Sequence, residues 1–152
     1  MALLFLLSVE CGQDKNAAES LVKYFESHYL HLGDKKEHQC LASVDEWKSA
    51  FWCVVAPDNL PRSGWGNEEE RKILEEAGNE LYCLLKDISG YRFAMVGIES
   101  GFFRTFDELK IETDLHIFHG LVVAEGILVD IEPCKSFEPF APGYKWIPYQ
   151  GE

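Results

Sequence analysis

The segment from Asn67 to Ile88 places the strongest constraint on what this chain can fold into. Asn67-Glu68-Glu69-Glu70 supplies a helix start, with an Asn cap and negative charge in the first turn, where the helix dipole favours it. Apolar residues then form one continuous stripe at helical spacing: Ile73, Leu74, Ala77, Leu81, Leu84, Leu85 and Ile88. At 1.5–3 kcal/mol per large side chain, burying this stripe contributes on the order of 10 kcal/mol. The sequence therefore predicts a helix over 67–88 that packs against a sheet or another helix.

A second amphipathic pattern predicts a helix over residues 16–32. Asn16-Ala17-Ala18-Glu19 has the form of a capping box, and Gly33 is placed to end the helix in a left-handed conformation. The apolar face of this helix would consist of Ala18, Leu21, Val22, Phe25, Tyr29 and Leu32.

Most other apolar runs are typical of strands. Residues 2–10 are interpreted as a buried strand rather than a signal peptide, because no Lys or Arg precedes the run and no cleavage site follows it. Ser43-Val44-Asp45-Glu46 resembles a third capping box, but the unbroken apolar run that follows favours a strand over 49–56. A shorter strand over 39–44 would pair with it through a turn at Asp45-Glu46.

The second half of the chain is rich in β-forming residues. A strand is predicted over 91–99, with Gly97 as a candidate bulge. Residues 106–110 predict one helical turn after Thr105, and residues 115–119 and 121–131 are β-rich.

The order of these elements, β-α-(β)-β-α-β-β-β, predicts an α+β protein. We expect a single domain over residues 1–152, because a chain of this length can bury a core of its own. The sheet would be mixed or antiparallel, with the two main helices at 16–32 and 67–88. This order is compatible with a ferredoxin-like βαββαβ core that carries a C-terminal β/aromatic extension.

That extension is an extended tail over residues 132–152, packed on or beside the domain. Its prolines exclude a regular helix or a central strand. Two interpretations stay open: a lid that covers the sheet, or a recognition element. We expect Phe137 and Phe140 to be buried, and Tyr144, Trp146 or Tyr149 to be partly exposed beside acidic groups.

The charge balance favours some partners over others. The chain has 26 acidic and 14 basic residues, a formal net charge of -12. Such a chain is predicted to bind neither nucleic acid nor an anionic membrane surface, since both attract Lys and Arg. A basic protein partner fits the charge.

The five cysteines carry no metal-binding or redox motif, because no pair has CxxC spacing. Cys53 and Cys83 lie in apolar surroundings typical of buried thiols. Cys11 follows the first strand, and we interpret it as a structural thiol rather than a nucleophile. Free thiols indicate a reducing compartment, so the expected location is cytoplasmic.

No metal or cofactor is predicted. His28 and His31 would lie in the last turn of the 16–32 helix, where histidines interact well with the helix dipole. His116 and His119 are weak candidates for metal ligands, because residues three apart on a strand point to opposite faces unless the backbone turns, which Gly120 would allow. Gly64-Trp65-Gly66 lacks the spacing of a phosphate loop.

Two features suggest a function. Seven carboxylates and only one basic residue, Lys110, lie between Asp107 and Glu132. The carboxylates are Asp107, Glu108, Glu112, Asp114, Glu125, Asp130 and Glu132. The other feature is the aromatic tail.

Aromatic anchors beside steering charges suit the recognition of a basic protein. The predicted binding residues are Asp107, Glu108, Glu112, Asp114, Tyr144, Trp146 and Tyr149. The leading hypothesis is an acidic protein-binding module, such as an inhibitor or immunity-type protein that neutralises a basic enzyme, for example a nuclease toxin. The alternative is a small enzyme or ligand-binding domain with a His/carboxylate pocket around residues 99–119, where Glu99 adds a further carboxylate; no residue is assigned a catalytic role.

Overall fold

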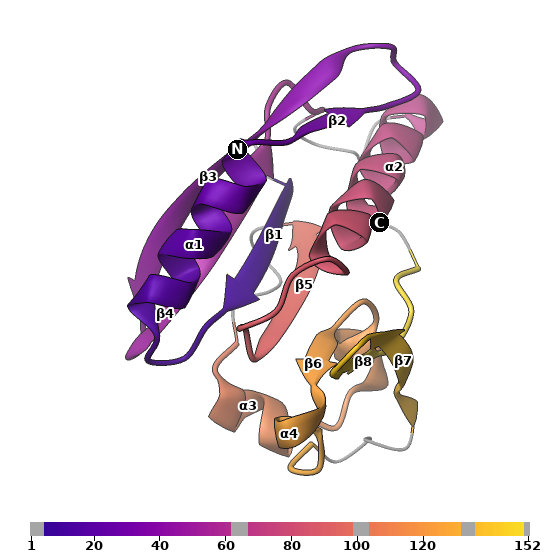
Figure 1. The fold of residues 1–152 in the computed structure, drawn as a ribbon. Coiled ribbons are helices and arrows are strands. Elements are labelled where there is room, and N and C mark those ends of the chain that lie inside the picture. Colours follow the sequence, from indigo (N-terminus) through magenta and orange to yellow (C-terminus); the bar gives the residue numbers. More distant parts are fainter. Residues whose placement is uncertain (1–4, 62–66, 99–103, 132–135, 151–152) are drawn as a thin grey trace.

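Eight strands form one sheet in the computed structural model, which describes residues 5–61, 67–98, 104–131 and 136–150 (Figure 1). The strand order is β2-β3-β4-β1-β5-β6-β8-β7, and every neighbouring pair is antiparallel. The strands are β1 (Phe5–Glu10), β2 (Tyr29–His31), β3 (Glu37–Trp47), β4 (Ala50–Pro57), β5 (Phe93–Ile98), β6 (Val122–Ala124), β7 (Glu138–Ala141) and β8 (Tyr144–Trp146). The helices are α1 (Lys15–Glu26), α2 (Glu68–Leu85), α3 (Phe106–Ile111), the 3-10 helix η2 (Leu115–Phe118) and α4 (Glu125–Leu128). The predicted α+β class with two long helices is confirmed.

The two long helices cover one face of this sheet, which we call the first face. Alternate residues of β1, namely Phe5, Leu7 and Val9, pack there in one cluster with buried residues of both helices. The central strands lie in the order β3-β4-β1-β5, and α1 and α2 follow β1 and β4 along the chain. This βαββαβ order is compatible with the ferredoxin-like arrangement.

A second apolar cluster lies on the opposite, second face of the sheet. Trp52 of β4, Phe93 of β5 and Val123 of β6 form its floor. The buried residues that cover them come from the later part of the chain: Leu109, Phe118, Leu121, Leu128, Ile131 and Phe137. We call the covering residues 104–119 and 125–131, which contain α3, η2 and α4, the acidic cap.

Helix α2 agrees closely with the prediction. The Asn67 side chain accepts a hydrogen bond from the Glu70 N–H at 2.8 Å, and Leu74, Ala77 and Leu81 are buried. The helix ends at Leu85, three residues before the predicted end. None of the described helices is both long and apolar enough to cross a membrane.

The predicted extent of the first helix is wrong at both caps. Asp14, not Asn16, caps α1 by accepting from the Ala17 N–H at 2.9 Å. The helix ends at Glu26, and Leu30 pairs with His38 in the β2–β3 hairpin. Gly33 is not left-handed.

The strand interpretation of 49–56 is confirmed, but the predicted turn is wrong. Strand β3 continues through Asp45 and Glu46 to Trp47. The turn consists of Lys48 and Ser49, with φ of 48° and 65°. Positive φ at both positions is what the common two-residue hairpin turn requires.

Further corrections concern the later segments. The expectation that the tail contains no central strand is wrong, because β8 contains no proline and lies between β6 and β7. Residues 115–119 contain the 3-10 helix η2, because the Asp114 side chain caps it by accepting from the His116 N–H at 3.0 Å. Residues 121–131 divide into β6 and α4. Gly97 pairs with Leu6 in an uninterrupted register, so it forms no bulge. The predicted helical turn after Thr105 is confirmed as α3, with a complete capping box.

Candidate functional site

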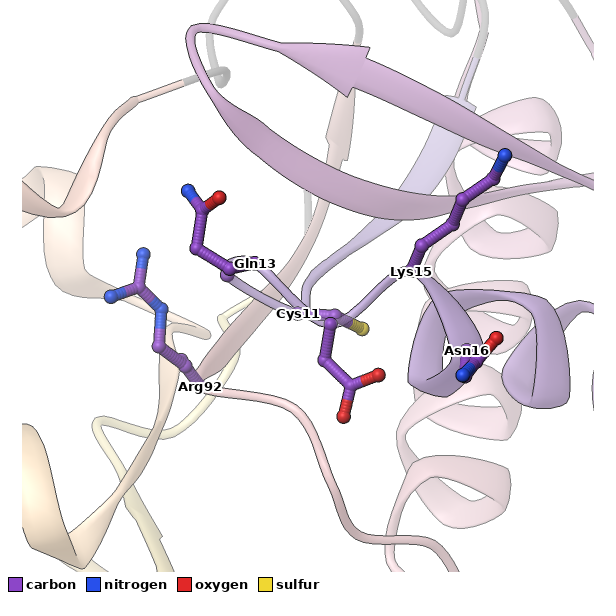
Figure 2. Close-up of a pocket in the computed structure, with 7 residues that line it drawn as sticks. Cys11, Gln13, Lys15, Asn16 and Arg92 are labelled. Atoms are coloured by element: carbon purple, nitrogen blue, oxygen red, sulfur yellow. The ribbon is translucent and has the colours of Figure 1, made fainter.

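A hollow of about 610 Å³ opens where β1 ends and α1 begins. Residues 11–16 and Arg92, which precedes β5, line it. Figure 2 shows Arg92 and Gln13 on one side of Cys11, and Lys15 and Asn16 on the other. A smaller hollow of about 180 Å³ shares Gln13 and Arg92 and lies between the β3–β4 turn and α3.

Between these hollows lies an ion pair with a buried carboxylate, which the sequence did not reveal. Glu10 is only 1% exposed, and its Oε1 accepts from the Gly12 N–H at 2.6 Å and from Arg92 Nε at 2.7 Å. Its Oε2 accepts from Arg92 Nη2. The hydrogen bond to Glu10 raises the pKa of Arg92, so the guanidinium stays charged. The guanidinium also lies 5.2 Å from the centroid of the Phe106 ring.

Cys11 lines the larger hollow but lacks the properties of a nucleophile. Burial raises the pKa of the thiol to about 12, and the negative charges of Glu10 and Asp14 add to the effect. A thiolate is the reactive form, and this thiol stays protonated at neutral pH. The interpretation of Cys11 as a structural thiol agrees with this environment. Cys53 is buried as expected, whereas Cys83 is exposed, which contradicts the prediction for it.

The two histidine pairs lie in other secondary-structure elements than the sequence predicted. His116 and His119 are on and directly after η2, so the chain turns and their ring centroids lie 5.4 Å apart. The strand predicted for this segment is therefore wrong, and the chain turns, which was the alternative. His31 is in β2 rather than in a helix, while the His28 ring packs on Tyr24. Within the described residues, no three His, Cys, Asp or Glu side chains come together to hold a metal ion.

A fifth histidine was not singled out from the sequence. His38 is fully buried, with Nδ1 2.6 Å from the Asp58 carbonyl oxygen and Nε2 2.9 Å from the Asp34 carboxylate. Both ring nitrogens lie within hydrogen-bond distance of an acceptor oxygen. These contacts join β3 to two loops.

Four predicted binding carboxylates lie together on the acidic cap. Asp107 forms an ion pair with Lys110 at 3.0 Å and its side chain is 89% exposed. The hydrogen bonds to Thr105 lower the pKa of Glu108. Glu112 lies 3.6 Å from Arg104, and Asp114 caps η2. The predicted carboxylates Glu99 and Glu132 lie outside the described residues.

Two large apolar side chains are exposed on the same cap. Ile111, the last residue of α3, is 80% exposed, and Val129, directly after α4, is 77% exposed. Glu125, the first residue of α4, and Asp130, the residue after Val129, are also exposed. The acidic cap thus presents apolar groups among carboxylates.

The aromatic residues predicted to bind lie elsewhere. Phe137 and Phe140 are buried as expected, but Tyr144 is buried too, and its hydroxyl donates to the Tyr91 carbonyl oxygen at 2.8 Å. Trp146 and Tyr149 are half-buried in the first-face cluster, with ring centroids 5.1 and 5.2 Å from that of Tyr82. The cap covers the second face, so the aromatic and acidic halves of the predicted site are not brought together as one cluster.

The predicted His/carboxylate pocket around 99–119 is represented only by the smaller hollow. Its lining residues from that segment are Thr105, Phe106 and Asp107, and no described histidine lines it. Comparisons of the chain with protein-family models, curated proteins and solved structures find no match.

Proposed function

We propose that this protein works by binding a basic protein partner through the acidic cap. The observation that carries the proposal is the exposure of Ile111 and Val129 among carboxylates. Interfaces combine apolar groups at the centre with a polar rim, and exposed apolar side chains among carboxylates fit that arrangement.

The charge of the cap suits the same role. The described residues of the cap include six carboxylates and two basic residues, Arg104 and Lys110. A formal net charge of -12 attracts basic proteins over a distance and accelerates their encounter. Once the partner is near, Ile111 and Val129 supply area that binding removes from water.

The form of the function that we favour is a cytoplasmic inhibitor or immunity-type protein that neutralises a basic enzyme, such as a nuclease toxin. Such an inhibitor needs a stable surface rather than a catalytic centre. The cap is fixed to the sheet by buried residues of α3, η2 and α4, so its surface is held in place before the partner arrives. Trp146 and Tyr149 contact Tyr82, so we expect their main role to be in stabilising the fold rather than in binding the partner.

The test is affinity purification from the source cells with two charge-matched variants. Glu125→Lys/Asp130→Lys changes the cap, and Glu69→Lys/Glu75→Lys changes exposed carboxylates of α2 by the same net charge. The proposal expects a basic protein to co-purify with the wild type and with the α2 variant. The cap variant should bind this protein at least about tenfold more weakly, a difference of ~1.4 kcal/mol.

Ile111→Ser/Val129→Ser tests the apolar anchors without changing the charge. Both side chains are exposed, so the fold should stay within ~0.5 kcal/mol of the wild type. Equal binding by the cap and α2 variants, or an acidic main partner, would show that the cap is not the interface.

A further inference from the structure

The outer edge of β3 has no neighbouring strand over most of its length in the described part of the chain. Strand β2 pairs with β3 only from Glu37 to Gln39, and the Cys40 N–H donates to the His28 carbonyl oxygen at 3.2 Å. From Leu41 to the end of β3, no strand of the described chain lies on this outer side. In Figure 1 the β2–β3 hairpin arches toward α2, and the rest of β3 forms the margin of the sheet beside α1.

The direction of the backbone groups along this edge follows from two hydrogen bonds. The Gln39 carbonyl oxygen accepts from the Asp58 N–H on the β4 side, whereas the Cys40 N–H points to the β2 side. Backbone groups alternate along an antiparallel strand. The N–H and C=O groups of Ala42, Val44 and Glu46 therefore point outward from the sheet.

We propose that a second copy of this chain adds its own β3 to this edge in an antiparallel, two-fold arrangement. The open edge runs from Leu41 to Trp47, so a symmetric pairing that uses all of it is centred on Val44. Val44 is also a residue whose backbone groups point outward, so the two Val44 residues can exchange both of their hydrogen bonds. Ala42 of each copy then pairs with Glu46 of the other.

The side chains suit this register. Leu41, which is 48% exposed, comes opposite Trp47 of the second copy, and Ser43 comes opposite Asp45. No carboxylate faces a carboxylate, although Asp45 and Glu46 both lie on the edge. Opposed like charges would destabilise the pair.

The ends of the open edge fit the same arrangement. In each copy the Lys48-Ser49 turn directs the chain toward β4 and away from the two-fold axis. This turn comes opposite Cys40, where β2 begins to occupy the edge. The paired segment of the second copy therefore ends where β2 would block further pairing.

The edge also lacks the usual devices that prevent such pairing. Between Leu41 and Trp47 there is no proline and no lysine, and the register with β4 is continuous, without a bulge. The charges of Asp45 and Glu46 are the exception, and the two-fold register places them opposite uncharged residues.

The test is the oligomeric state, measured by sedimentation velocity from about 5 to about 200 µM, where small interfaces associate. The wild type is expected to form a dimer with increasing concentration. Val44→Pro removes the outward N–H, which has no role in the pairing with β4, and proline is tolerated at such edge positions. This variant should dimerise at least about tenfold more weakly, a difference of ~1.4 kcal/mol.

Val44→Thr is the matched control, because it keeps the N–H and the β-branched shape and should dimerise like the wild type. Circular dichroism checks that Val44→Pro folds, and Glu46→Pro, which removes the next outward N–H, replaces it if it does not. A wild type that stays monomeric over this range, or a folded proline variant that dimerises normally, would overturn the proposal.

Salt separates this inference from the proposed function, on which it does not rest. Two copies with a net charge of -12 repel each other, so dimerisation should strengthen as salt rises from about 0.05 to about 0.5 M and screens that repulsion. Binding of a basic partner should weaken over the same range. A dimer that salt weakens would mean that ionic contacts, not backbone pairing, hold the copies together.

Discussion

Replacing Arg92 by methionine should show how much the fold depends on the ion pair at the end of β1. Methionine keeps most of the length of the side chain but removes the guanidinium. The Glu10 carboxylate then loses the hydrogen bonds from Nε and Nη2 and keeps only the one from the Gly12 N–H. Glu10 would be left as a buried charge without its partner.

The size of the effect follows from the burial of the two side chains. Removing one partner of a fully buried pair costs about 3–5 kcal/mol. The Arg92 side chain is 39% exposed and borders two hollows, so water can approach the carboxylate once the guanidinium is gone. We therefore expect a loss near the lower limit, about 3 kcal/mol of unfolding free energy.

Urea denaturation followed by circular dichroism measures the loss in Arg92→Met, Glu10→Gln and the double variant. Glutamine removes the buried charge, and its oxygen can still accept from the Gly12 N–H. The double variant should therefore be more stable than Arg92→Met alone by at least ~1 kcal/mol. A cost below ~1 kcal/mol for Arg92→Met, or a double variant less stable than it, would refute the reasoning.

Three further predictions concern other contacts. Gly78→Ala would normally stabilise a helix, but the added Cβ would lie 2.7 Å from the Tyr149 ring, so we expect this variant to have a lower Tm than the wild type. In a chain that already carries Tyr149→Ala, the same change should raise the Tm instead. Tyr82→Phe removes a hydroxyl that donates to a carbonyl oxygen at 2.7 Å and accepts from an N–H at 3.0 Å, and should cost about 1–3 kcal/mol in denaturant unfolding. Burial raises the pKa of Asp34, but hydrogen bonds from the Lys36 N–H and from His38 outweigh this and lower it. The ionised Asp34 side chain thus stabilises the fold above its unfolded pKa of about 3.9, and this contribution is lost as the pH falls through its pKa in the folded protein. In an acid titration, Asp34→Asn should therefore lose less unfolding free energy than the wild type.

The elements that the sequence predicted well are those whose signals are local. Helix α2 has its cap and its apolar stripe within one segment, so both favour a helix there independently of the rest of the chain. The end of α1 was mispredicted because Tyr29 and Leu32 continue the helical spacing. In the structure Leu30 and Leu32 are buried, whereas Tyr29 and His31 are exposed, which is the alternation of a strand. Pairing with β3 stabilises this strand in place of a longer helix.

The candidate site was harder to predict because its parts are distant in the chain. Glu10 and Arg92 are separated by 82 positions and meet only because β1 and β5 are neighbours in the sheet. The one available signal was Glu10 itself, a carboxylate at the end of an apolar strand. The exposure of Ile111 and Val129 could not be predicted either, since the apolar residues around them are buried.

The central position of β1 also determines the order in which the sheet can be assembled. It precedes the other described strands of this sheet along the chain, yet Leu7 pairs with Val55 on one side and with Val96 on the other. The β3–β4 hairpin, in contrast, closes through two residues, and hairpins form in roughly 1–10 µs. This hairpin can therefore form early and provide the surface on which β1 docks. Strand β5 must follow, so pairing over this long separation is expected to limit the folding rate.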